Sequence, residues 1–299
     1  MRLDAALALA LPELGLRARR RLWDWCLIKV NGRPCARGYM AGPGDEVRVE
    51  AMPPCGGGVM NVEPGSGPAA DEAPVPLAAN AAYAAFFKPA GLHSARMAAS
   101  PHASLEEALE RHWSALRARH GWRAERAVLL TRLDACTSGI VLAALDEDAA
   151  VSFRTMEAAG EVRKRYLGLV RGRLHEALLL TSALGTDGGR VTRLLEREDP
   201  DPARHTLVRP LRFAPPGALA GVHEVGTVVL ACIGRGARHQ IRAHLAAAGH
   251  PLLGDALYGG GEGGFFLHSA ELVMPGFMVR CLPSWSFLPD ADRLLDAVP

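Results

Sequence analysis

Cysteine pairs and zinc-type ligand spacings are missing from this 299-residue chain. No Cys-x-x-Cys pair occurs, and no His/Cys group has the spacing of a metal site. A chain of this length buries enough apolar surface to fold without disulfides. We therefore expect free thiols in a reducing compartment and no bound metal. The six cysteines are Cys26, Cys35, Cys55, Cys136, Cys232 and Cys281.

Long hydrophobic runs and a signal peptide are also missing. No apolar stretch approaches the roughly 18 residues that a membrane-spanning helix needs. Asp4 interrupts the apolar start of the chain, which excludes the usual secretory pattern. Hydrophobic residues nevertheless make up 49% of the sequence, enough for a full core and a small additional domain. These features predict a soluble cytoplasmic protein with no membrane partner.

Lysine is scarce, and the charges nearly balance. Lysine occurs only at Lys29, Lys88 and Lys164, and arginine supplies the other basic side chains. Arginine suits bidentate recognition of phosphate, but the same bias also arises from genome composition, which is the simpler explanation. The formal net charge of +2 indicates neither the presence nor the absence of a nucleic-acid partner. Local clusters must therefore decide.

Residues 1–50 have the pattern of a compact unit that is locally positive, with nine Lys and Arg against six Asp and Glu. A basic group precedes a predicted strand that enters an Asn31-Gly32 turn. Such a group is most commonly a solvated helix face. Its members are Arg17, Arg19, Arg20 and Arg21. Residues 51–80 are rich in Pro, Gly and Ala, which favours a linker.

Residues 81–299 combine strand and helix patterns without an internal repeat. A capping box at Ser104 and Glu107 begins one predicted helix, which ends before Gly121. Further helices are predicted over residues 146–160 and 237–250. Strands are predicted within residues 81–91, 127–131, 139–145, 165–172 and 227–233. The sequence therefore predicts an α+β fold, with helices around a mixed, mostly antiparallel sheet that carries a central cleft.

The stretch TRLDACTSG, residues 131–139, lies between two of these strands. Taken alone, it has two interpretations. The Asp134 carboxylate can simply bond Thr137 or Ser138 in a tight turn, which is the commoner case for an isolated Arg-Leu-Asp. Alternatively, Arg132 can share a face with Asp134 in extended backbone and hold its carboxylate anionic for chemistry.

Five stretches, taken in order, resemble the RluA-type family of pseudouridine synthases and favour the second interpretation. Any one of them would be weak evidence, whereas five in order with plausible spacing are strong. They are FFKPAGLHS (86–94), TRLDACTSGIVLAAL (131–145), RKRYLGLVRG (163–172), RHQIRAHLAAAGHPLLGDALYG (238–259) and LHSAELVMP (267–275). Residues 1–50 resemble the small S-four RNA-binding domain that many members carry. The implied domains are thus 1–50 for RNA binding, 51–80 as linker and 81–299 for catalysis.

The resemblance implies an isomerase that converts a specific uridine in structured RNA to pseudouridine, in ribosomal RNA ahead of transfer RNA. The base is detached from its ribose, rotated and rejoined through carbon, with one aspartate and neither a metal nor an organic cofactor. A carboxylate beside the ribose can act as a nucleophile at the anomeric carbon or as a base on the neighbouring carbon. The sequence leaves this choice open.

The predicted catalytic residues are Asp134, Arg132 and Tyr166. The ring of Tyr166 can stack on uracil, an interaction worth about 1–3 kcal/mol per base, although a lone strand tyrosine is usually a core residue. His268 is predicted to be structural. RNA phosphates are expected to contact the basic group near the N-terminus, the strand of Tyr166 and the start of the helix near residue 237. The predicted RNA-binding residues are Arg17, Arg19, Arg20, Arg21, Lys29, Lys164, Arg235, Arg238, Gln240 and Arg242.

Three positions depart from the family pattern. Thr131 replaces a histidine and Phe87 an asparagine; the first predicts altered loop packing rather than loss of activity. Ala237 stands where the family has an arginine that is expected to pair with the catalytic carboxylate. Arg238 or Arg235 is the candidate replacement.

Ala237 and Thr131 motivate an alternative, a non-catalytic RNA-binding or RNA-folding protein on the same scaffold. A third interpretation, a carboxylate hydrolase of nucleosides, needs a second carboxylate near Asp134. Its candidates are Asp146, Glu147 and Asp148, which a helix start explains better. The sequence does not determine the oligomeric state, for which a monomer is the working expectation, nor the target uridine.

Overall fold

The computed structural model describes residues 26–31, 33–34, 40–42, 44–51, 73–96, 103–185, 191–215, 224–261 and 264–297. The described part of the N-terminal unit is a three-stranded antiparallel sheet of β1 (Cys26–Val30), β2 (Arg33–Pro34) and β3 (Val47–Ala51), in the order β2-β1-β3. Asn31, at the predicted turn, has a φ of 51° between β1 and β2. The predicted RNA-binding residues Arg17, Arg19, Arg20 and Arg21 lie outside the described residues.

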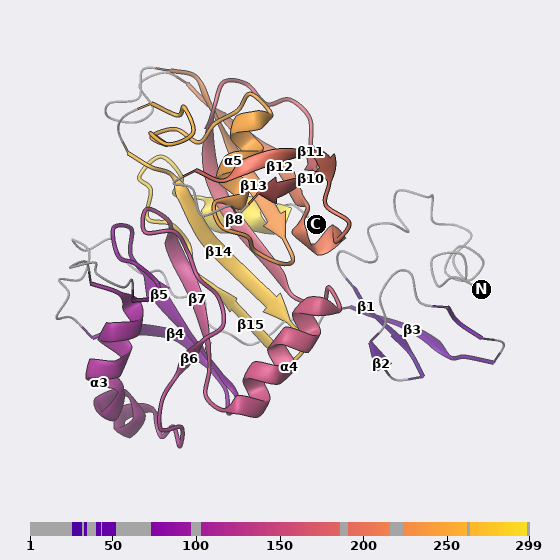
Figure 1. The fold of residues 1–299 in the computed structure, drawn as a ribbon, viewed down its shortest axis with the longest axis vertical. Helices are drawn as coiled ribbons and strands as arrows, with labels where there is room; N and C mark the ends of the chain where they lie inside the picture. Colours follow the sequence, from indigo (N-terminus) through magenta and orange to yellow (C-terminus); the bar gives the residue numbers. More distant parts are fainter. Residues whose placement is uncertain are drawn as a thin grey trace.

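Most strands of the described residues join one main sheet (Figure 1). Its strands are β4 (Val75–Ala79), β5 (Tyr83–Lys88), β6 (Val128–Leu129), β7 (Ser138–Ala144), β8 (Arg163–Arg171), β9 (Leu178–Leu180), β12 (Thr206–Ala214), β13 (Gly226–Ile233), β14 (Leu267–Met274) and β15 (Phe277–Arg280). The order is β4-β5-β7-β14-β8-β13-β12-β9, with β15 on β14 and β6 on β7. The β7–β14 pair is parallel and the other pairs are antiparallel. The predicted mixed, mostly antiparallel sheet is confirmed.

A small second sheet and four α-helices complete the described body. The small sheet pairs β10 (Ser182–Gly185) with β11 (Arg193–Glu198). The helices are α3 (Leu105–His120), α4 (Glu147–Ala158), α5 (Gln240–Ala247) and α6 (Ala291–Ala297), with a short 3-10 turn η1 (Pro202–Arg204). In α3, Ser104 and Glu107 form the predicted capping box, and Gly121 ends the helix with a φ of 69°.

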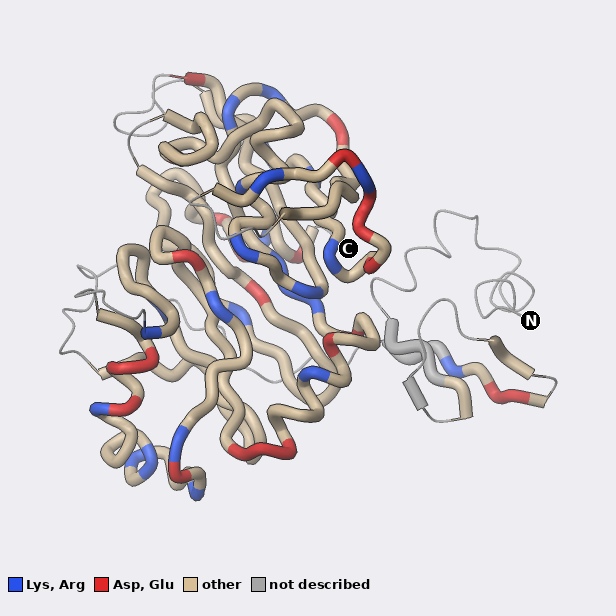
Figure 2. Tube along the Cα trace, viewed as in Figure 1, with Lys and Arg blue, Asp and Glu red and all other residues tan. Residues whose placement is uncertain are grey.

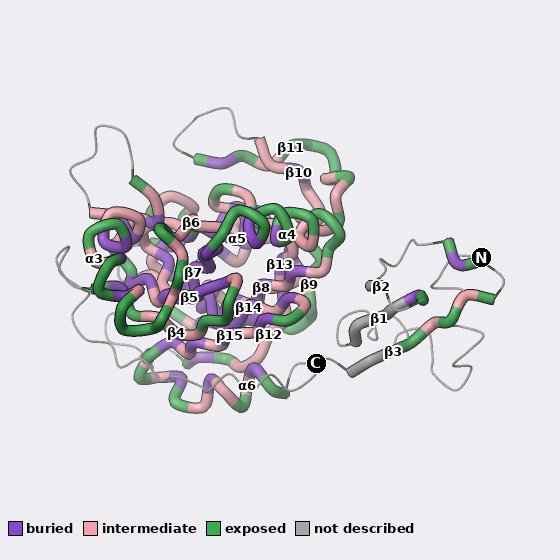
Figure 3. Tube along the Cα trace, turned by 90° about the horizontal axis from the view of Figure 1, so that it is seen from below, coloured by how far each residue is buried: buried purple, intermediate pink, exposed green. Residues whose placement is uncertain are grey.

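Side chains that alternate along the central strands pack into hydrophobic clusters on both faces of the main sheet. Figure 3 shows the buried residues gathered along these strands. On β7, Val141 packs in the cluster that contains residues of α3 and α5, whereas Leu142 packs in the cluster of α4. On β8, Tyr166 joins the same cluster as Val141, and Leu167 joins the cluster of α6. Because strand side chains alternate between faces, Tyr166 lies on the face that α5 covers.

Two element boundaries differ from the prediction. The strand β4 lies inside the predicted 51–80 linker, yet it pairs with β5 at the edge of the main sheet. The body therefore begins before residue 81. The Pro-rich composition hid a short edge strand, where proline is tolerated because one row of N–H groups needs no partner.

The helix α5 begins three residues later than predicted, at Gln240. His239 precedes it in the left-handed conformation, with a φ of 56°. Arg238 therefore lies before the helix, although the predicted helix over residues 237–250 included it.

Candidate active site

The Asp134 turn connects β6 to β7. The backbone carbonyl of Asp134 accepts the N–H of Thr137 at 3.0 Å, so the main chain closes the turn. The hydroxyl of Ser94 donates to the carbonyl of Leu133 and accepts its N–H, both at 2.8 Å. The Asp134 side chain keeps 22% of its surface exposed. Its carboxylate is thus available for partners outside the turn.

Gly139 brings the Asp134 turn against the neighbouring strand. β7 and β14 pair through Gly139 and Ser269. The φ of Gly139 is 112°, and a Cβ there would lie 2.3 Å from the carbonyl oxygen of Ser269. A side chain at this position would therefore push the two strands apart. Ser269 is also paired with Tyr166 of β8. Gly139, which follows the Asp134 turn, and Tyr166 therefore lie on either side of the same residue of β14.

Thr131 and His268 attach the two ends of the Asp134 turn to β7 and β14, respectively. The Thr131 hydroxyl accepts the N–H of Leu142 at 2.8 Å. His268 donates from Nε2 to the carbonyl of Cys281 at 3.0 Å, so its Nδ1 accepts the Ser138 hydroxyl at 2.8 Å. Burial lowers the pKa of His268 to about 4, and the ring is neutral. His268 thus has the structural surroundings that were predicted for it.

Lys88, the last residue of β5, supports the Asp134 turn. Its side chain is fully buried. Nζ donates to the carbonyls of Pro89, Leu92 and Ala135, at 2.8, 2.7 and 3.2 Å. Burial lowers its pKa to about 7, against the attraction of Cys136 and Asp134. The ammonium group thus ties the entry strand to the residue that follows Asp134.

Replacing Lys88 by methionine should lower the free energy of unfolding by about 3 kcal/mol, because three buried carbonyls lose their donor. The loss should be larger at pH 9 than at pH 7. The folded-state pKa of Lys88 is near 7 and its unfolded value near 10.5, so the unfolded chain binds more protons in this range. Wild-type stability then rises with pH, by about 2 kcal/mol relative to K88M. Urea unfolding at both pH values measures this, and an equal loss at both would contradict it.

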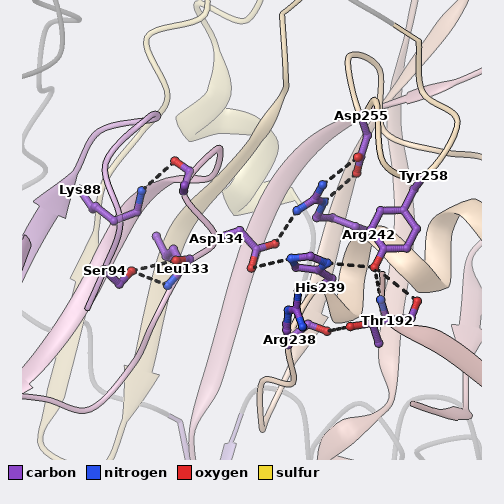
Figure 4. Close-up of polar contacts among 11 residues, drawn as sticks. Lys88, Ser94, Leu133, Asp134, Thr192, Arg238, His239, Arg242, Asp255 and Tyr258 are labelled. Carbon is purple, nitrogen blue, oxygen red and sulfur yellow. Dashed lines mark hydrogen bonds and ion pairs between the residues drawn. The ribbon is translucent and has the colours of Figure 1, made fainter. Parts of the chain in front are cut away.

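Arg242, from α5, is the basic partner of Asp134 (Figure 4). Its Nη1 donates to Asp134 Oδ2 at 3.0 Å, and its Nε and Nη2 donate to Asp255 at 2.7 and 2.8 Å. The guanidinium lies over the rings of Tyr258 and Phe265, 5.2 and 5.3 Å from their centroids. Burial alone would lower the pKa of Arg242, but the bonds to Asp255 and Asp134 outweigh it and raise that pKa. The cation is permanently charged and fixed in place.

This pairing corrects three predictions. The partner that was sought for Ala237 is Arg242, not Arg235 or Arg238. Arg132 is exposed, and the ion pair predicted for it is made by Arg242 instead. Arg242 itself was predicted to bind RNA, but it is buried among protein groups.

His239 approaches the other oxygen of Asp134. Its Nε2 lies 3.8 Å from Asp134 Oδ1, and its Nδ1 lies 3.0 Å from the hydroxyl oxygen of Tyr258. That hydroxyl oxygen also accepts the N–H of Thr192 at 2.8 Å. Burial lowers the pKa of His239, which favours the neutral ring. Figure 4 shows these residues as a row that leads from the carboxylate to Thr192.

Tyr166 lies close to the same carboxylate but is largely buried, with 7% of its surface exposed. In the sheet it is paired with Ser269 of β14. Burial raises the pKa of Tyr166, and the Asp134 charge adds to the rise. The phenol is therefore neutral at physiological pH.

The other predicted RNA-binding residues divide between the interior and the surface. Lys164 is buried and pairs with Glu157 of α4. Gln240 is buried and donates to the carbonyl of Arg204 at 2.7 Å. Neither is placed to contact RNA, because both side chains are used inside the protein; these two predictions are wrong. Lys29, also predicted to bind RNA, lies in β1.

Arg235 and Arg238 remain near the surface. Arg235 is partly exposed and contacts Asp201 at 3.2 Å and Glu157 at 3.7 Å. Arg238 is exposed, and its carbonyl accepts the Thr192 hydroxyl at 3.0 Å. Figure 2 shows Lys and Arg interspersed with Asp and Glu over the body rather than gathered in one block.

No group of three or more His, Cys, Asp or Glu among the described residues could hold a metal ion. No helix in the same part of the chain is long and apolar enough to cross a membrane.

Residues 82–247, more than half of the chain, match the family model described as RNA pseudouridylate synthase. The chain belongs to this family. It is 30% identical over 271 residues to the ribosomal large subunit pseudouridine synthase D of Xylella fastidiosa, a match that covers 87% of this chain and 71% of that protein. It is 32% identical over 132 residues to the tRNA pseudouridine synthase C of Salmonella typhimurium, covering 43% of this chain and 50% of that one.

The solved structure of human RNA pseudouridylate synthase domain containing 1 has the same fold, with a TM-score of 0.57 at 23% identity over 79% of this chain and 97% of that one. The chain is a pseudouridine synthase, and the reaction of this family is an intramolecular isomerisation.

Four residues near the Asp134 carboxylate of this pseudouridine synthase were not predicted from the sequence as site residues. They are Lys88, His239, Asp255 and Tyr258. Asp255 and Tyr258 lie in the glycine-rich stretch GDALYGG, residues 254–260. One feature of the sequence could have identified these two residues as part of the site. Asp255 and Tyr258 stand among glycines inside residues 238–259, the longest stretch that resembles the family.

Proposed function

We propose that this chain converts a specific uridine in structured RNA to pseudouridine, with Asp134 acting at the ribose. The observation that carries the proposal is the difference between the two oxygens of the Asp134 carboxylate: one is bound by a cation, and the other has no close hydrogen-bond partner among the described residues. Arg242 binds Oδ2 at 3.0 Å, whereas Oδ1 has His239 only at 3.8 Å and the side chain stays 22% exposed. A carboxylate that is oriented on one side and open on the other suits chemistry on a neighbouring atom.

The isomerisation breaks the bond between N1 of uracil and C1′ of the ribose, and it forms a bond between C5 and C1′. The proton of C5 leaves, and N1 gains one, so no atoms are gained or lost. Asp134 would serve either as a nucleophile at C1′ or as a base at C2′. Both roles need the ribose swung out of the strand, at a cost of a few kcal/mol that RNA contacts must offset.

Tyr166 is proposed to lie against the uracil ring. Its position in the sheet supports this role, because Ser269 pairs with Tyr166 on one side and with Gly139, next to the Asp134 turn, on the other. Because burial raises its pKa, we propose that it contacts the base as a neutral phenol and does not take a proton as a phenolate.

Ribosomal RNA is the proposed substrate, ahead of transfer RNA. In support, the match to the ribosomal large subunit enzyme spans 87% of this chain, and the match to the tRNA enzyme spans 43%. We also propose that residues 1–50 act as an S-four-like RNA-binding unit. Their excess of basic over acidic residues, nine against six, supports that role.

Mapping pseudouridine across total RNA tests the proposal, in cells with the gene, without it, and complemented by it. One uridine, or a few, in ribosomal RNA should lose modification in the deletion and regain it on complementation. A site that appears only in transfer RNA would replace the proposed substrate. An unchanged map across all RNA would overturn the function.

Two competing functions lose their motivation. The non-catalytic alternative rested on Ala237 and Thr131, but Arg242 supplies the basic partner and the Thr131 hydroxyl accepts a backbone N–H beside the site. The hydrolase alternative needs a second carboxylate free to act. Of its candidates, Asp146 caps α4, and Glu147 and Asp148 lie in the first turn of that helix. Both oxygens of Asp255 are bound to Arg242.

A further inference from the structure

We propose that His239 is a positioning residue for Asp134, held in the Nε2–H tautomer by the hydroxyl of Tyr258. In this arrangement, His239 orients the open oxygen Oδ1 while Arg242 holds Oδ2. The inference rests on the proposed function, because it concerns the oxygen that would act on the ribose.

The backbone at residue 239 is the first observation. His239 and Asn31 are the two non-glycine residues of the described chain that have a positive φ. Left-handed backbone at a non-glycine residue is unfavourable and persists where surrounding contacts enforce it. Here it places the imidazole between Asp134 and Tyr258 instead of along the surface of α5.

The hydrogen-bond partners select one tautomer. The Tyr258 hydroxyl has one proton and two neighbours that can accept it, His239 Nδ1 at 3.0 Å and the Thr192 carbonyl at 3.3 Å. If Nδ1 accepts, Nε2 carries the ring proton and points a donor at Asp134 Oδ1. If Nδ1 donates instead, a neutral ring turns a lone pair toward a carboxylate, which is unfavourable. The shorter distance and the charge of Asp134 both favour the Nε2–H form.

Thr192 keeps the Tyr258 hydroxyl in place. Thr192 is buried although it directly precedes the exposed start of β11. Its N–H donates to the Tyr258 hydroxyl oxygen at 2.8 Å, and its own hydroxyl donates to the carbonyl of Arg238 at 3.0 Å. The phenol is therefore attached to main chain on one side and to the imidazole on the other.

The distance to Oδ1 indicates restraint rather than a formed bond. At 3.8 Å the Nε2–H group attracts the oxygen but does not satisfy it. Oδ1 is thus kept on the His239 side while its lone pairs stay available. The charged groups that act on the ring are Asp134 and Asp255, which favour its protonation, and Arg242 and Arg238, which oppose it.

The test compares H239N, H239Q and Y258F as full-length proteins. Asparagine tolerates left-handed backbone, and its amide can replace Nδ1 but cannot reach the position of Nε2. H239N should lower kcat about tenfold, with KM within about twofold and the unfolding temperature nearly unchanged. In H239Q the side-chain amide reaches farther, so it should recover a large part of kcat. If kcat of H239N equals that of wild type, the positioning role is wrong.

The second readout is the NMR chemical shift of the two imidazole nitrogens of His239 in the protein without RNA. The signal that disappears in H239N is the one that belongs to His239. Wild type should show the Nε2–H tautomer, and Y258F should add a clear fraction of the Nδ1–H form. A wild-type ring in the Nδ1–H form would refute the inference. The tautomer is read without substrate, so this result stands apart from the RNA map that tests the proposed function.

Discussion

Asparagine in place of Asp134 should abolish pseudouridine formation, by at least about 10³-fold in kcat/KM, and leave the fold intact. The amide has nearly the same shape, but it can neither attack C1′ nor take a proton from C2′. Stability should change by less than about 1 kcal/mol, since the carboxylate is partly exposed. Arg242 keeps both bonds to Asp255 in this variant.

The measurement is single-turnover conversion of the mapped RNA, together with RNA affinity by filter binding. D148N is the matched control, because Asp148 is an exposed acid in the first turn of α4. We expect D148N to retain full activity and D134N to retain affinity within about threefold. Residual turnover of D134N near that of wild type would show that another group performs the chemistry.

Glutamine in place of Arg242 should both destabilise the protein and inactivate it. Removing the guanidinium leaves Asp255 as a buried carboxylate without its ion-pair partner, which costs about 3–5 kcal/mol. The same change removes the group that orients Asp134. We expect a fall of at least about 10²-fold in kcat, a loss typical of a removed electrostatic partner.

A second variant separates the two effects. R242Q/D255N replaces both members of the buried pair by neutral amides, so most of the lost stability should return. Activity should not return, because Asp134 still lacks its cation. Urea unfolding and single-turnover kinetics on the three proteins measure both quantities. Recovery of activity in the double variant would mean that Arg242 serves only the fold.

Local signals were enough to predict the elements whose ends are set by their own residues. The capping box at Ser104 and the left-handed Gly121 bound α3 as expected. The N-terminal end of α5, which lies at the site, could not be predicted from local residues alone. Its start depends on Gln240, which bonds residues of η1 and β12, and on the left-handed His239.

The centre of the site was predicted and its surroundings were not. Asp134 stands in a distinctive local pattern, and the partner given to it was the nearest arginine, Arg132. Its actual partner, Arg242, is 108 residues away in sequence. Arg242 looked like a surface helix residue because no periodicity indicates that Asp255 folds back onto it. Contacts of this kind are set by topology, which brings the Asp134 turn and α5 together.

The charges of Asp134, Asp255 and Arg242 restrict how an RNA strand can approach the site. Asp134, Asp255 and Arg242 together carry a formal charge of −1. The buried Lys88 near the Asp134 turn offsets this charge only in part, because burial lowers its pKa to about 7. A phosphodiester brought up to Oδ1 would meet repulsion, whereas an uncharged sugar and uracil would not. The substrate strand must therefore thread with its phosphates held outward, toward solvent. Only the electrically neutral part of one nucleotide can descend to the carboxylate.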